Sequence, residues 1–254
     1  MNGRFAHATR VMNGVTARLE KKLLIWIAHR LPRFIHSDHL TGLAALAMAG
    51  AAIAYAWSRS WPPALLLVNL CLFINWFGDS LDGTVARVRN QQRPRYGFYV
   101  DHVLDCAGIA ILVLGMAASD LMSLSMALAF LVAYFLVSAE VYLATYCLAS
   151  FRMSFLGFGP TELRILLAVG NVIAMRTPAI QLLGESWRLF DVGAAVAIPL
   201  LVSAFLMAAV RNGRALFLAE PRPSAQSSRC ADSPPSSGAP HQRVRAETPH
   251  ESLA

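Results

Sequence analysis

Charged residues are scarce in this sequence. Asp, Glu, Lys and Arg make up 15% of the 254 residues, whereas a soluble domain has roughly 25%. Apolar residues make up 56% of the chain. This balance excludes an ordinary soluble globular domain and indicates an integral membrane protein.

Cysteine pairs and repeats are also missing. Cys71, Cys106, Cys147 and Cys230 show no paired spacing. Three of them lie in or beside apolar runs, which favours small core residues over disulfides or metal ligands. The net charge of +7 is typical of cytoplasmic loops in a membrane protein, and no basic–aromatic pattern indicates nucleic-acid binding. We find no internal repeat of the kind that many transporters show.

Long apolar runs are what the sequence does have. Each is about long enough for a helix across a bilayer core of about 30 Å. We therefore expect an all-α integral membrane protein with about six transmembrane helices. The predicted spans cover roughly residues 39–58, 62–78, 101–118, 120–149, 161–177 and 189–210.

The basic residues predict the orientation. With six spans, 19 of the 22 Lys and Arg residues lie on the side of the two termini, and only Arg59, Arg176 and Arg188 lie on the other. Because cytoplasmic loops carry the excess of Lys and Arg, we expect both termini in the cytoplasm. The acidic stretch between spans two and three then faces the cytoplasm of a bacterial-type inner membrane.

Three regions follow from this pattern. Residues 1–38 mix Leu, Ile and Trp with Lys and Arg at helical spacing, which predicts an N-terminal amphipathic juxtamembrane helix; an ordinary basic flank that fixes topology is the alternative. Residues 39–215 form the six-helix domain. Residues 219–254 are rich in Pro, Ser, Arg and Glu, so we expect a disordered cytoplasmic tail.

The stretch "GDSLDGTVARVRNQQRPRYGFYVDHVLD" holds an unusual density of charge for a membrane protein. If span two continues as a helix through residue 87, then Asp79, Asp82, Gly83 and Ala86 share one face. Gly inside a helix costs about 1 kcal/mol relative to Ala, which is easier to understand where a ligand approaches the backbone. Arg87 follows Gly83 by four residues and can reach an anion held over this face.

Span three presents a second acidic face. Gly97, Asp101, Asp105 and Gly108 are spaced by 4, 4 and 3 residues. A short basic loop joins the two helices, so we expect antiparallel neighbours with all their acidic residues at one depth. Unpaired carboxylates so close together would repel, and two Mg²⁺ or Mn²⁺ ions would neutralise them and suit phosphoryl transfer. Solvated helix-end charges are the alternative, which the matched faces disfavour.

The same residues carry a resemblance. "DSLDGTVAR", nine further residues and "GFYVDHVLD" match D-x2-D-G-x2-A-R-x(8 or 9)-G-x3-D-x3-D at every fixed position, and this pattern resembles that of the CDP-alcohol phosphotransferase family. The resemblance implies transfer of a substituted phosphate from a CDP-alcohol to an acceptor hydroxyl, with release of CMP, in phospholipid biosynthesis. It implies a metal site formed by Asp79, Asp82, Asp101 and Asp105, with Asp105 also the catalytic base. Gly83, Ala86 and Arg87 would line the nucleotide pocket.

The start of span one departs from the family pattern. The family often has Pro-Asn shortly before a Thr, whereas "HSDHLTG" has Ser37 and Asp38 before Thr41. Thr41 remains a candidate nucleotide contact. Capping of the helix by Ser37 or Asp38 is an equally good interpretation of this segment.

The acceptor residues are less clear from the sequence. His102 after Asp101, and the segment GPTE at residues 159–162, resemble the choline and ethanolamine phosphotransferase branch, but the donor could equally be CDP-diacylglycerol. Glu140, in an apolar helix, needs a partner, either a headgroup or a structural one. Asn171 favours an interhelical hydrogen bond over a ligand.

Two other classes of protein compete with this interpretation. An intramembrane prenyltransferase also uses Asp-rich helices and Mg²⁺, but its acidic motifs lie far apart in sequence. A small transporter or scaffold would show broken helices and paired repeats. The partners we expect are a CDP-alcohol donor, a lipid or small polar alcohol as acceptor, the bilayer and a second copy of the chain.

Overall fold

The structure is a computed structural model that describes residues 15–148, 160–182 and 184–220. It divides into two units, residues Met1–Arg214 and Ala215–Ala254; the contacts described below lie within the first, and α7 continues to Ala219. The predicted tail lies outside the described residues from residue 221 onwards. The elements are α1 (Val15–Arg30), α2 (Ser37–Ser58), α3 (Ala64–Val88), α4 (Pro94–Ala118), α5 (Leu124–Leu148), α6 (Pro160–Ala174), β1 (Ala179–Leu182), β2 (Glu185–Arg188) and α7 (Leu189–Ala219).

The prediction of an all-α membrane fold is confirmed. Five helices, α2 to α5 and α7, are long and apolar enough to cross a bilayer. The remaining predicted span corresponds to α6, which has 15 residues and begins at Pro160. The β1–β2 hairpin was not predicted; its strands pair antiparallel, and Gly184 between them has φ 84°, a conformation that favours glycine. An N-terminal helix, α1, precedes the first span, as expected.

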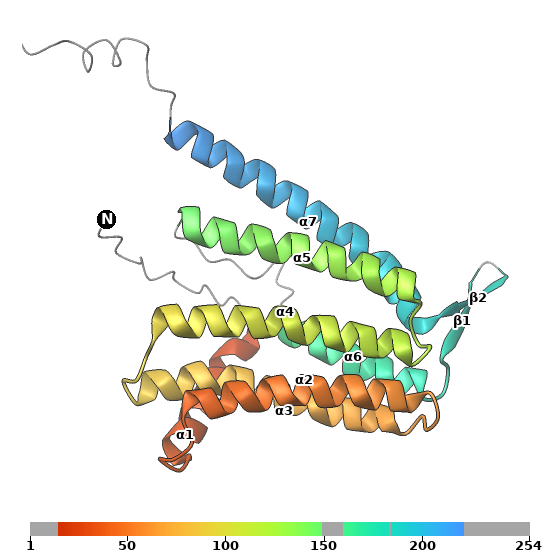
Figure 1. Cartoon of the computed structure of the whole chain (residues 1–254), viewed down its shortest axis with the longest axis horizontal. Coiled ribbons are helices and arrows are strands. Elements are labelled where there is room, and N and C mark those ends of the chain that lie inside the picture. Colours follow the sequence, from red (N-terminus) through yellow and green to blue (C-terminus); the bar gives the residue numbers. More distant parts are fainter. Residues whose placement is uncertain (1–14, 149–159, 183, 221–254) are drawn as a thin grey trace, which may run out of the picture. The chain divides into compact units, whose positions relative to one another are not determined.

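Helices α2, α3 and α4 form the centre of the fold. Figure 1 shows them side by side, and α2 packs against both of the others. The connections between them are short, residues 59–63 and 89–93, so each helix is antiparallel to the next. Pro94 is the first residue of α4, where its missing N–H leaves no helical bond unmade. The buried contact surface between these helices includes Tyr55, Leu65, Val68, Leu72, Leu112 and Met116.

Two glycines let these helices approach closely. A Cβ at Gly78 of α3 would lie 2.7 Å from the carbonyl oxygen of Leu40 in α2. A Cβ at Gly115 of α4 would lie 2.6 Å from the carbonyl oxygen of Ala52, also in α2. Since real side chains do not tolerate such distances, glycine at both positions sets the spacing of α3 and α4 from α2.

Helix α1 is held against the end of α3. Leu24 and Ala28 are buried against Leu81 and Val85. The guanidinium of Arg89 then donates to the carbonyl oxygens that follow α1: those of Leu31, Pro32, Arg33 and Ile35. The chain between α1 and α2 is thereby tied to the loop that follows α3.

The start of α2 corrects one prediction. Neither Ser37 nor Asp38 caps the helix, because the N-cap residue is His36. The backbone N–H of His36 donates to Nδ1 of His39 at 3.1 Å. Asp38 instead forms an ion pair with Arg93 of the α3–α4 loop, so its carboxylate links the starts of α2 and α4.

A buried polar network fixes α6 against α2 and α3. The Tyr55 hydroxyl of α2 donates to Oδ1 of Asn171 at 2.8 Å, and Nδ2 of Asn171 donates to Oδ1 of Asn69 in α3 at 2.8 Å. Nδ2 of Asn69 donates to the carbonyl oxygen of Ala168. The prediction that Asn171 makes an interhelical hydrogen bond is confirmed.

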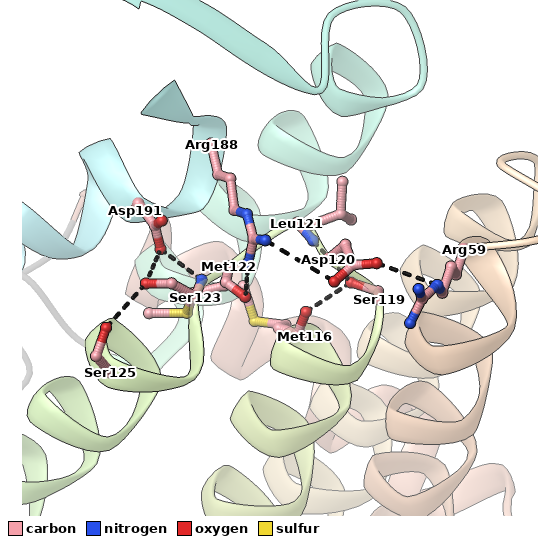
Figure 2. Close-up of polar contacts among 10 residues, drawn as sticks. All are labelled: Arg59, Met116, Ser119, Asp120, Leu121, Met122, Ser123, Ser125, Arg188 and Asp191. Carbon is pink, nitrogen blue, oxygen red and sulfur yellow. Dashed lines mark hydrogen bonds and ion pairs between the residues drawn. The ribbon is translucent and has the colours of Figure 1, made fainter. Parts of the chain in front are cut away.

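The α4–α5 turn is fixed by a polar cluster (Figure 2). Asp120, with φ 61°, pairs with Arg59 after α2 at 3.1 Å and with Arg188 of β2 at 3.9 Å. The backbone N–H and the hydroxyl of Ser123 both donate to the buried Asp191 of α7. These contacts join the end of α2, the α4–α5 turn and the start of α7.

Candidate active site and metal centre

The acidic residues of α3 and α4 lie close together, in the last turns of α3 and the first turns of α4. Asp79, Asp101 and Asp105 each offer a carboxylate oxygen, and these three oxygens lie within 4.8 Å of one another. All three side chains are half-buried. Both helices pack on α2, and the short connection of residues 89–93 brings the last turns of α3 and the first turns of α4 to the same end of α2. Three of the four predicted carboxylates therefore come together.

Asp82 lies at the edge of this group, toward α2. Its Oδ2 accepts a hydrogen bond from the Thr41 hydroxyl at 2.7 Å, and its Oδ1 accepts one from the backbone N–H of Gly83. Asp82 is close enough to Asp79 and Asp101 for their charges to interact. The fourth predicted carboxylate is thus nearby, held by Thr41, and Thr41 joins α2 to the acidic site.

Asp79 has a cationic partner on α6. Nη2 of Arg164 lies 2.7 Å from Oδ2 of Asp79, and the Arg164 side chain is only 16% exposed. Nε of Arg164 donates to Oδ1 of Asn75 at 2.9 Å, and Nδ2 of Asn75 donates to the carbonyl oxygen of Ala44 at 3.1 Å. Arg164 lies outside the acidic motif of the sequence. Its pairing with Asp79 was not predicted.

The small residues of the motif leave room beside the carboxylates. Among the described residues, the flexible end of the Arg87 side chain lies nearest to Gly83. Its Nη1 would lie 3.3 Å from a Cβ added at Gly83. Nη2 of Arg87 donates to the Thr84 hydroxyl at 3.1 Å, and the side chain as a whole is exposed. A Cβ at Gly97 would meet none of the described atoms within 4 Å. Gly83 and Ala86 are partly exposed and Arg87 is exposed, so the described residues leave the predicted nucleotide-lining face accessible.

His102 faces α5. Its ring stacks on Phe98 with centroids 4.0 Å apart and meets Tyr142 of α5 edge-on at 4.7 Å. Its Nδ1 lies 2.7 Å from the carbonyl oxygen of Phe98. The Tyr142 hydroxyl in turn lies 3.5 Å from Sγ of Cys106. His102 thus contributes to the contact between α4 and α5, directly beside Asp101.

The other candidate acceptor residues lie on α5, on α6 or outside the described residues. Glu140 of α5 accepts a hydrogen bond from Nδ2 of Asn212 in α7 at 2.6 Å, which is the structural partner that a glutamate in an apolar helix needs. Glu162 is exposed in the first turn of α6. Gly159 lies outside the described residues.

The donor set fits a hard divalent cation. Carboxylate oxygens are the ligands that Mg²⁺ and Mn²⁺ prefer, and three of them converge within 4.8 Å. Like charges held this close repel unless a cation neutralises them. Arg164 forms an ion pair with Asp79, and three carboxylates beside one guanidinium form a predominantly acidic group that suits a divalent cation.

The fold and this site define an integral membrane protein with an acidic site that is able to bind metal at one end of its helices. The model of the family described as CDP-alcohol phosphatidyltransferase matches residues 34–210. The chain therefore belongs to this family of metal-dependent transferases, which points to phosphatidyl transfer in lipid synthesis. A comparison with curated proteins found no match.

Proposed function

We propose that this protein transfers a substituted phosphate from a CDP-alcohol to an acceptor hydroxyl and releases CMP, as a step of phospholipid biosynthesis. The donor is CDP-diacylglycerol or a CDP-amino-alcohol. One observation carries the proposal: Asp79, Asp101 and Asp105, which the family motif places on two helices, present oxygens within 4.8 Å of one another. Family membership disfavours the prenyltransferase, transporter and scaffold alternatives.

The proposed roles follow from position. Asp79, Asp82, Asp101 and Asp105 hold two Mg²⁺ or Mn²⁺ ions, which when bound neutralise charge on the phosphate oxygens and make CMP a better leaving group. The accessible face of Gly83, Ala86 and Arg87 receives the nucleotide end of the donor, and the Arg87 guanidinium is suited to a phosphate. Thr41, beside Asp82, is proposed as a further nucleotide contact.

Asp105 is the proposed catalytic base. It lies one helical turn from Asp101 on α4, on the side away from the α3–α4 loop. The acceptor oxygen attacks the donor phosphorus, the phosphorus–oxygen bond to CMP breaks, and the Asp105 carboxylate takes the proton of the acceptor hydroxyl. Such a group must come within hydrogen-bond reach of that hydroxyl in the bound complex.

We further propose that the site faces the cytoplasm of a bacterial-type inner membrane. The excess of Lys and Arg on the side of the termini supports this orientation. Water-soluble CMP would then be released into the cytoplasm. The acceptor, a lipid or a small polar alcohol, would reach Asp105 from the bilayer or from the same aqueous side.

CMP release tests the proposal directly. The full chain in lipid nanodiscs is incubated with CDP-diacylglycerol, CDP-choline or CDP-ethanolamine and a panel of acceptor alcohols. We expect acceptor-dependent CMP release with one donor, its loss with a chelator, and its recovery with Mg²⁺ or Mn²⁺. Asp101→Asn is the matched control, since it keeps the side-chain shape and removes the charge. Absence of CMP from every donor, with folded protein, would contradict the proposal.

A further inference from the structure

Arg164 reaches the acidic site from a helix outside the family motif. It is carried by α6, whereas the four carboxylates lie on α3 and α4. Its guanidinium has two anchors: Nη2 meets Asp79 at 2.7 Å and Nε meets Asn75 at 2.9 Å. Both bonds use the planar arrangement of guanidinium donors, which a lysine cannot reproduce.

Helix α6 is also attached to α2 and α3 at a second point. Ala168 and Asn171 follow Arg164 by four and seven residues, so all three share one face of α6. That face packs on α3. At its far end, Asn171 is fully buried and hydrogen-bonds to Tyr55 and to Asn69. Helix α6 therefore contacts α2 and α3 through hydrogen bonds that do not involve Arg164.

Asn75 is fixed as well. It is buried in α3, and its Nδ2 donates to the carbonyl oxygen of Ala44 in α2. Its Oδ1 is thereby directed at Nε of Arg164. Asn75 therefore orients the guanidinium, which holds Asp79 through one carboxylate oxygen, Oδ2.

We propose that Arg164 is a positioning residue for the metal site, which orients the Asp79 carboxylate for a divalent cation. The inference rests on the proposed function, because Asp79 is one of the ligands assigned there. Helix α6, which carries no residue of the motif, would then contribute to the site. Removing a residue that orients a metal ligand lowers the metal affinity by roughly 10–100-fold. A cation that acted only through its charge would have the opposite effect, because its removal would strengthen metal binding.

Mn²⁺ binding to the full chain in nanodiscs, measured by electron paramagnetic resonance without any nucleotide, tests this role. Arg164→Met removes the donors and Arg164→Lys keeps the charge but not the two-point contact. We expect both to weaken Mn²⁺ binding by roughly 10–100-fold. Asn75→Ala removes the second anchor and should weaken binding in the same direction, which keeps the test valid if Arg164→Met fails to fold. Tyr55→Phe, a change in the α6 attachment that leaves Asp79 untouched, should keep wild-type affinity.

Several outcomes would overturn the inference. Unchanged or tighter Mn²⁺ binding in Arg164→Met, or wild-type affinity in Arg164→Lys, would show that orientation by the guanidinium is not needed. Equal weakening in Tyr55→Phe would show that the effect comes from α6 docking alone. The Mn²⁺ titration needs no turnover, so it can be interpreted even if the wild-type protein releases no CMP. A failure of the proposed enzymatic function can therefore be distinguished from a failure of this inference.

Discussion

Replacing Gly78 by alanine should reduce turnover by displacing Asp79. The added Cβ would lie 2.7 Å from the carbonyl oxygen of Leu40 and 3.0 Å from Cβ of Ala44, whereas ordinary contact begins at 3.4 Å. The α2–α3 spacing must therefore widen by about 0.7 Å, the difference between 3.4 and 2.7 Å. Asp79 is the next residue, and the Thr41–Asp82 hydrogen bond crosses the same contact.

The expected loss in rate follows from that displacement. A misplacement of about 1 Å can cost about 10²-fold in rate, so we expect the rate of CMP release to fall roughly 10–100-fold. Overpacking of this kind also costs about 1–3 kcal/mol in the free energy of unfolding. Initial rates of CMP release at saturating donor, with thermal unfolding in the same nanodiscs, measure both effects.

Gly115→Ala is the matched control. Its Cβ would lie 2.6 Å from the carbonyl oxygen of Ala52, so the steric demand against α2 is similar. Gly115 lies ten residues beyond Asp105 in α4, about 15 Å along the helix. We expect a comparable loss of stability and less than about threefold loss of rate. Equal rate losses in the two variants, or full activity in Gly78→Ala, would refute the link between this contact and the geometry of the site.

Asp105→Asn should lower the rate of transfer by roughly 10²–10⁴-fold, the usual contribution of a general base, while CDP-alcohol binding is retained. A parallel Mn²⁺ titration checks this assignment. If the metal affinity falls in proportion to the rate, Asp105 is a metal ligand and not the base. The orientation can be tested by labelling single cysteines with an impermeant maleimide in intact cells, in a variant without the four native cysteines. A cysteine at the exposed Gln92 should be protected, whereas one at the exposed Ser60 should react. Labelling at position 92 from outside would reverse the proposed orientation.

The part of the site that sequence reasoning recovered is local in the chain. Asp79, Asp101 and Asp105 fall within 27 residues, and a short loop makes their two helices run antiparallel, with the acidic turns at the same end. Helical periodicity then places their side chains without knowledge of any other element. The long helices were predictable for a similar reason, because each apolar run specifies its own span.

The missed features depend on distant or ambiguous partners. Arg164 and Asp79 are 85 residues apart, and one polar residue in an apolar helix has many chemically equivalent partners. The cap of α2 was misassigned because Ser37 and Asp38 are stronger N-cap formers in general, yet Asp38 pairs with Arg93. The hairpin was missed because its two four-residue strands are short and lie between runs that resemble membrane helix.

The location of Arg164 on α6, later in the chain than the carboxylates, has a consequence for biogenesis. Membrane proteins are made from the N-terminus, so α3 and α4, with their four carboxylates, are synthesised before α5 and α6. The nascent acidic cluster must therefore exist for a time without the guanidinium that pairs with Asp79. Uncompensated carboxylates are costly beside the hydrocarbon core. During this interval, Thr41 of α2 is already present beside Asp82, and water and divalent cations can balance the charge of the cluster. The docking of α6 then adds the ion pair between Arg164 and Asp79.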